Sequence, residues 1–191
     1  MKKFLTALAV ALMLTGNVEA AEFTQAQLDK IFLEVGQVEG FATLNLNAET
    51  LKEQFNGRIT TILKEATGND DISGMAHLFL IKDYKIFSGA DGDTFANVFG
   101  DYRVALVGAG EKGGNFKSLS MCYTTPEDSD EAIFTIWHLT AFVKSLAPDV
   151  NVQTLMNDLT AENASGSVVA GGVKFSIAED GNLNILTATT P

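Results

Sequence analysis

The glycines at positions 108–113 follow the pattern of a dinucleotide-binding loop, with Gly108, Gly110 and Gly113 at the required spacing. In such a loop the glycines let the backbone approach a pyrophosphate at the N-terminus of a helix. The residues that follow here alternate with period two, which predicts a strand and leaves no helix to hold the phosphate. We therefore expect a glycine-rich connection between two strands, and we expect no cofactor.

Two carboxylates, Asp91 and Asp93, flank Gly92 and could supply oxygen ligands to a calcium ion. Calcium takes about six to eight oxygen ligands, which usually come from several regularly spaced side chains. The spacing of an EF-hand loop and its closing glutamate are both absent. Because Asp and Gly are also the residues that turns select, the sequence predicts a turn here. Asp91 and Asp93 remain the candidate ligands if a metal binds.

His77, His138 and Cys122 are the other side chains with catalytic potential. The chain has no HExxH, paired cysteines, GxSxG or SxxK, so no catalytic or zinc motif joins them locally. An enzyme would need a site assembled from distant residues, with Asp91 and Asp93 as further members. Each histidine adjoins apolar residues, and we expect both to be core or boundary residues, with Cys122 buried as a small apolar side chain.

The first twenty residues predict a secretory signal peptide. Lys2 and Lys3 precede an apolar run over residues 4–14, and Val18 and Ala20 provide small residues for cleavage after Ala20. The apolar run is shorter than the roughly 20 residues that a membrane-spanning helix needs. We expect a mature chain of residues 21–191 in the periplasm or the medium, without membrane insertion.

Charge and cysteine content limit the partners and the means of stabilisation. The formal net charge of −11 disfavours binding to nucleic acid or to anionic membrane surfaces. With Cys122 as the only cysteine, an internal disulfide cannot form, so an exported domain must be stabilised by its core. The mature length fits a single domain.

The elements that position these residues follow from apolar periodicity. We expect helices over residues 24–35, 48–67, 127–146 and 152–159, the third of them central to the core. We expect strands over residues 77–81, 85–87, 94–99, 102–107, 115–123, 173–177 and 183–188, with a loop over 161–172. In the strand at 115–123, Leu119, Met121 and Tyr123 should be buried, and the opposite face carries small polar groups.

This order predicts an α+β fold, with a mainly antiparallel sheet of about five to seven strands packed against two to four helices. Helices precede strands twice, which permits a degenerate duplication with its boundary near residue 125. The absence of catalytic motifs favours an exported, non-enzymatic module that binds a protein or a small ligand. Two alternatives stay open, namely a hydrolase or metal-dependent enzyme and a structural subunit of a cell-envelope assembly. In the last case, residues 166–172 would offer a pairing edge.

Overall fold

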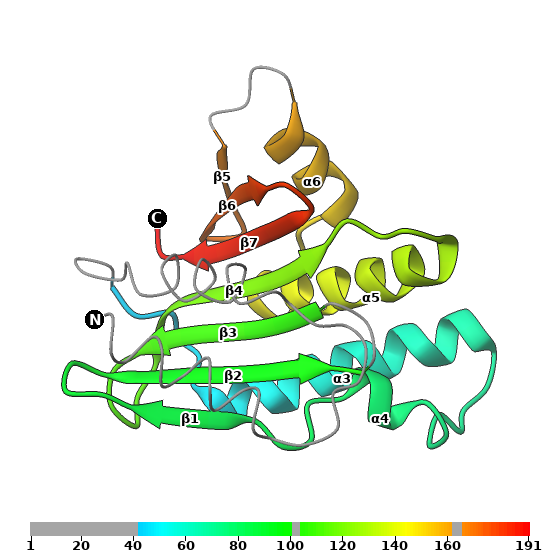
Figure 1. The fold of residues 1–191 in the computed structure, drawn as a ribbon, viewed down its shortest axis with the longest axis horizontal. Coiled ribbons are helices and arrows are strands. Elements are labelled where there is room, and N and C mark those ends of the chain that lie inside the picture. The colour runs from blue at the N-terminus through cyan, green and yellow to red at the C-terminus, as the bar shows by residue number, and fades with distance from the viewer. Residues whose placement is uncertain (1–41, 101–103, 162–165) are drawn as a thin grey trace.

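One antiparallel sheet organises the part of the chain that the computed structural model describes, residues 42–100, 104–161 and 166–191 (Figure 1). The strands are β1 (Lys85–Ser88), β2 (Asp93–Phe99), β3 (Val104–Gly110), β4 (Phe116–Thr124), β5 (Ser167–Ala170), β6 (Val173–Asp180) and β7 (Leu183–Thr189). Their order in the sheet is β1-β2-β3-β4-β7-β6-β5, and every neighbouring pair is antiparallel. The expected α+β class and antiparallel sheet are confirmed.

The described helices are α3 (Ala48–Thr67), α4 (Ala76–Phe79), α5 (Ser129–Leu146) and α6 (Val152–Thr160). Helices α3 and α5 pack against each other and lie behind the sheet in Figure 1. None of the helices in the described ranges is long and apolar enough to span a bilayer. The predicted helix over residues 24–35 and the signal peptide lie outside the described residues.

Helix α3 has the predicted bounds because local signals fix both of its ends. Asn47 caps the N-terminus: its side chain accepts a hydrogen bond from the Thr50 amide, and its own amide donates to the Thr50 hydroxyl. At the C-terminus Gly68 adopts the left-handed conformation, with φ of 64°. The buried stripe of α3 consists of Leu51, Phe55, Ile59 and Leu63.

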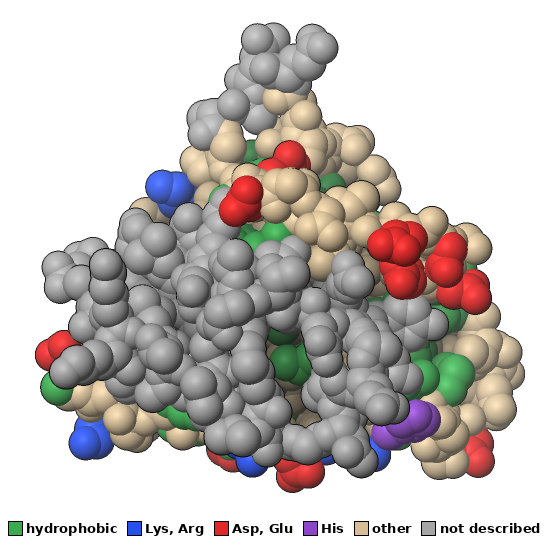
Figure 2. All heavy atoms as spheres, in the orientation of Figure 1, with side chains coloured by type: hydrophobic (Ala, Val, Ile, Leu, Met, Phe, Trp, Pro, Cys, Tyr) green, Lys and Arg blue, Asp and Glu red, His purple; other side chains and the backbone are tan. Residues whose placement is uncertain are grey.

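Helix α5 begins two residues later than predicted, because Asp128 is its N-cap and accepts hydrogen bonds from the Asp130 and Glu131 amides. Acidic side chains gather on the surface where this helix begins (Figure 2), a position that the helix dipole favours. The helix lies centrally in the core, as expected. Two of its apolar side chains, Ile133 and Ile136, are nevertheless exposed.

Two segments differ from the sequence predictions. The expected strand over residues 77–81 is wrong, because the Met75 and Ala76 amides donate to the Ile72 carbonyl and start the single turn of α4. A short apolar run cannot distinguish a buried strand from a helical turn, and Phe79 is buried in either case. The expected loop over 161–172 contains the edge strand β5, which pairs with β6.

The two halves of the sheet meet through their final strands, β4 and β7. Helix α3 precedes the β1–β4 meander, and α5 and α6 precede the β5–β7 meander. Because β4 and β7 are antiparallel, a twofold rotation about an axis between them would place the strands of one half approximately on those of the other. A duplication would produce this arrangement, although the duplication itself remains a prediction.

Candidate functional site

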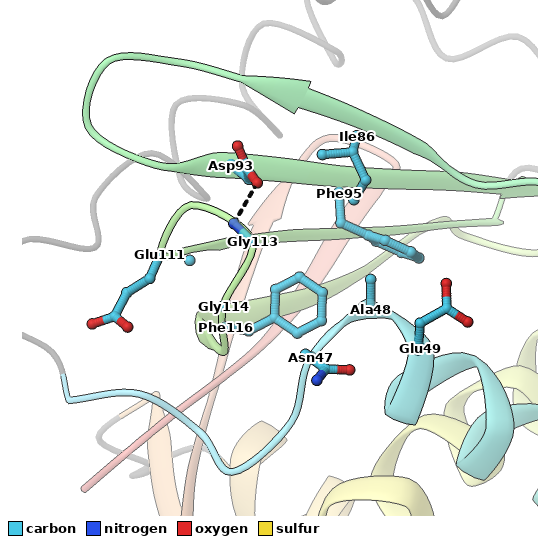
Figure 3. A pocket seen from close by; sticks show the side chains of 11 residues that line it. Asn47, Ala48, Glu49, Ile86, Asp93, Phe95, Glu111, Gly113, Gly114 and Phe116 are labelled. Atoms are coloured by element: carbon cyan, nitrogen blue, oxygen red, sulfur yellow. Dashed lines mark hydrogen bonds between the residues drawn. The ribbon is translucent and has the colours of Figure 1, made fainter.

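A recess of about 280 Å³ opens where the β1–β2 and β3–β4 hairpins end beside the first turn of α3. Figure 3 shows its side chains converging from three segments that are far apart in the sequence. Aromatic and aliphatic groups form its inner wall, and carboxylates and hairpin backbone form its rim. The lining residues are Asn47, Ala48, Glu49, Ile86, Asp93, Phe95, Gly110, Glu111, Gly113, Gly114 and Phe116.

Asp93, the first residue of β2, links the two hairpins at the rim. Its Oδ2 accepts a hydrogen bond from the Gly113 amide at 2.7 Å. Its Oδ1 is shielded from solvent and has no hydrogen-bond partner among the described residues. The pKa of Asp93 is lowered by the nearby Ser88 hydroxyl, then by the Gly113 amide, with a smaller contribution from the Lys112 charge. Asp93 is therefore an ionised carboxylate at neutral pH, and its Oδ1 is enclosed without a hydrogen-bond partner among the described residues.

The inner wall is held by aromatic packing. The rings of Phe95 and Phe116 meet edge to face with their centroids 5.7 Å apart, and the Tyr84 ring packs against Phe95 with its centroid at 5.0 Å. The Tyr84 hydroxyl donates a hydrogen bond to the Glu49 carboxylate, which raises the pKa of the tyrosine. Glu49 is thereby tied to the wall through one of its carboxylate oxygens.

The glycine motif at 108–113 is a hairpin connection, as predicted from the strand that follows it. Gly108 and Gly110 lie in β3, and the chain turns back into β4 at Phe116. A methyl group on Gly108 would lie 2.7 Å from a Leu119 methyl, and one on Gly110 would lie 2.3 Å from the Asn115 carbonyl oxygen. Close packing of the hairpin therefore accounts for these two glycines.

Asp91 lies exposed in the turn before β2 and does not line the recess. Of the two candidate ligands, Asp91 therefore faces open solvent, whereas Asp93 lies at the rim of the recess. Within the described ranges, no group of three His, Cys, Asp or Glu side chains is arranged to hold a metal ion. Asp93 functions here as a hydrogen-bond acceptor for the neighbouring hairpin.

His138 lies in the core of the molecule, surrounded by aromatic rings. Its ring centroid is 4.2 Å from that of Phe134, 4.4 Å from that of Phe99 and 5.3 Å from that of Phe79. Burial lowers the pKa of His138 to about 4, although the hydrogen bond to the Phe134 carbonyl opposes the shift. The expected core role is confirmed for His138.

His77 and Cys122 lie elsewhere. His77 is exposed on the short helix α4, so the expectation of a core or boundary position is wrong for His77. Cys122 is fully buried in β4, where burial raises the pKa of its thiol. Its neighbours in the strand, Met121 and Tyr123, belong to the helix-covered core, so the alternation of β4 directs Cys122 to the other face of the sheet. The sheet therefore separates Cys122 from His138, and neither lines the recess.

Sequence reasoning identified Asp93 but missed the wall residues Phe95 and Phe116 and the cap residue Asn47. One local signal was available, since Asp93 and Phe95 are two residues apart in a strand and must share a face. The contacts of α3 and of the β3–β4 hairpin with that face join segments that are distant in the sequence, so no local pattern indicates them. No family model, curated protein or solved structure matches this chain.

Proposed function

We propose that the mature chain is an exported binding module that holds a small cationic group in the hairpin recess. The unpaired, ionised oxygen of Asp93 at the rim of an apolar recess is the observation that carries this proposal. A desolvated carboxylate oxygen attracts a charged hydrogen-bond donor. The net charge of −11 also favours the approach of cations.

The shape and lining of the recess define the ligand class. Its volume of about 280 Å³ suits a group the size of a side chain. Phe95, Phe116 and Ile86 offer apolar contact to a short aliphatic stem, and Asp93 offers an acceptor to a terminal ammonium. A primary alkylamine, or the lysine side chain of a partner protein, combines these two features.

A nuclear magnetic resonance titration tests the proposal with n-butylamine as the probe. Because the Gly113 amide donates to Asp93, its signal should shift saturably with n-butylamine and stay unchanged with n-butanol, which lacks the charge. Asp93→Asn should abolish the shift. Asp91→Asn removes an equal charge from the exposed turn and should leave the response intact. A response to n-butanol, or loss of the response in both variants, contradicts an ammonium site at Asp93.

The proposed export has its own test. The basic residues, apolar run and small residues of positions 1–20 support cleavage after Ala20. Mass spectrometry of the chain recovered from the periplasm or medium of a bacterial host should find Ala21 at the N-terminus. Recovery of chain beginning at Met1 from the cytoplasm alone would contradict export.

A structural subunit is the second candidate, favoured by the edge strand β5. This four-residue strand pairs with β6 on one side, and Val169 is 60% exposed. A sheet edge with an exposed β-branched residue can add a strand from another chain. Sedimentation should then show association that Val169→Lys reduces, whereas a monomer at high concentration would argue against this role.

A further inference from the structure

Strand β1 forms one end of the described sheet and also borders the recess. It pairs with β2 on one side, and its residues Lys85, Ile86 and Ser88 are exposed. Ile86 is opposite Phe95 in the register, and both side chains line the recess in Figure 3. The edge of the sheet and the recess are therefore adjacent.

The hydrogen-bond register shows where the backbone groups of β1 point. In an antiparallel pair, residues that exchange both backbone bonds alternate with residues whose N–H and C=O groups point away from the partner strand. The Gly89 amide donates to the Gly92 carbonyl at 2.8 Å, so this pair is of the bonded kind. Counting back along the register, Ser88 and Ile86 are of the other kind. Ile86 and Ser88 therefore direct their N–H and C=O groups toward the edge of the sheet.

The side chains of Ile86 and Ser88 lie on the recess face of β1. Ile86 lines the recess, and Ser88 shares its face because side chains alternate along a strand. In an antiparallel pair, directly opposite residues have their side chains on the same face. A segment that hydrogen-bonds to Ile86 and Ser88 in antiparallel register therefore presents its opposite side chains to the recess.

Charge complementarity favours a lysine at the position opposite Ser88. The described residues that line the recess include the carboxylates Glu49, Asp93 and Glu111 and no basic side chain. Ser88 is opposite Asp93, and neighbouring strands lie about 5 Å apart, so a residue opposite Ser88 on an added strand would be about 10 Å from the Asp93 backbone. A lysine side chain spans about 6 Å and passes the short serine side chain, which brings its ammonium beside the Asp93 carboxylate.

We propose that β1 and the recess together bind an extended segment of a partner protein, which adds as an antiparallel strand to β1 and inserts a lysine opposite Ser88. This inference rests on the proposed ammonium site and adds the backbone conformation of the partner to it. Main-chain hydrogen bonds to Ile86 and Ser88 supply affinity, and the recess selects the side chain. A lysine on a helix would not satisfy the edge, because the backbone groups of a helix are bonded internally.

Titration with the pentapeptide acetyl-Thr-Val-Lys-Val-Thr-amide, followed by nuclear magnetic resonance, tests the proposal. The Ile86 and Ser88 amide signals should shift together with that of Gly113, with an affinity at least about tenfold higher than for n-butylamine. Two N-methylated peptides of equal mass and charge are matched controls. A methyl group on the lysine amide, which faces β1, should weaken binding at least about fivefold, whereas one on the following valine amide, which faces away, should change it less than about twofold.

The ammonium and the strand are tested separately. Replacing the peptide lysine by norleucine should abolish the Gly113 shift, and Asp93→Asn should do the same for the lysine peptide, whereas Asp91→Asn should not. Equal binding of the two methylated peptides, or unshifted Ile86 and Ser88 amides, would overturn strand addition; if n-butylamine still shifts Gly113, the ammonium site itself stands. Shifts of Ile86 and Ser88 that depend on protein concentration without peptide would also overturn the proposal and would assign the edge to a second copy of the chain.

Discussion

The Nδ1 atom of His138 lies 2.8 Å from the carbonyl oxygen of Phe134, one helical turn earlier in α5. Because a carbonyl only accepts, Nδ1 carries the proton of the neutral ring. Nε2 then presents a lone pair to the surrounding phenylalanine rings and has no hydrogen-bond partner among the described residues. Protonating this nitrogen would place an unpaired charge in the core, so His138 couples stability to pH.

The first prediction follows from that coupling. The folded pKa of about 4 is below the ordinary value of 6.5, so the unfolded chain takes up the proton first as the pH falls. The free energy of unfolding should therefore fall progressively between pH 6.5 and pH 4, and His138 should account for roughly 3 kcal/mol of the loss. Urea denaturation at several pH values measures it. His138→Leu should flatten the dependence in this range, and the exposed His77→Leu should not; equal slopes in the two variants would contradict the assignment.

The second prediction concerns Asn56, which joins α3 to the segment after α4. Its side chain donates to the Ile81 carbonyl at 2.9 Å and accepts from the Ile81 amide at 2.8 Å. Ile81 is fully buried, so Asn56→Ala leaves two backbone groups without partners. We expect a loss of about 2 to 3 kcal/mol in the free energy of unfolding. Gln54→Ala, at an exposed position of the same helix, should change it by less than about 0.5 kcal/mol.

The third prediction separates the glycines of the 108–113 motif. A methyl group on Gly110 would meet the Asn115 backbone at 2.3 Å, and relief requires movement of the hairpin. Gly110→Ala should cost about 3 kcal/mol. Gly113 has open space around it and a φ of 63°, so Gly113→Ala should cost about 1 kcal/mol through conformation alone. Thermal denaturation of the two variants checks the order, and equal losses would contradict the packing argument.

The fourth prediction links Asp93 to the proposed ammonium site. The pKa of this carboxyl is held below its usual value of 3.8 by Ser88 and Gly113, so Asp93 stays ionised in mild acid. The affinity for n-butylamine should therefore be constant from pH 8 to pH 5, because the amine stays charged throughout. Calorimetric titration measures it. A decline of affinity over this range would indicate a different titrating group and would contradict recognition by Asp93.

Local signals predicted much of the fold. The apolar stripe of α3 predicted this helix, and Gly181, with a φ of 62°, marks the turn between the predicted strands β6 and β7. These features depend on neighbouring residues alone, so the sequence contains them in full. The α4 segment shows the limit, because an apolar run of five residues fits either a strand or a helical turn.

The rest of the fold depends on the pairing of segments that are far apart in the sequence. No local signal in β4 indicates that Cys122 lies opposite Ile185 in β7, or that its face is closed to solvent. The recess likewise depends on Asn47, Asp93 and Phe116, which come from three segments that only the fold brings together.

The sequence by itself determined the alternation of helices and strands, the turns, the acidic charge and the absence of an internal disulfide. The tertiary structure alone decided that Asp93 meets Gly113, that His138 is enclosed by phenylalanine rings and that Cys122 lies across the sheet from it. The physical reason is that periodicity and capping act over a few residues. Which distant segments contact one another depends instead on the total apolar surface that the whole chain buries when it packs.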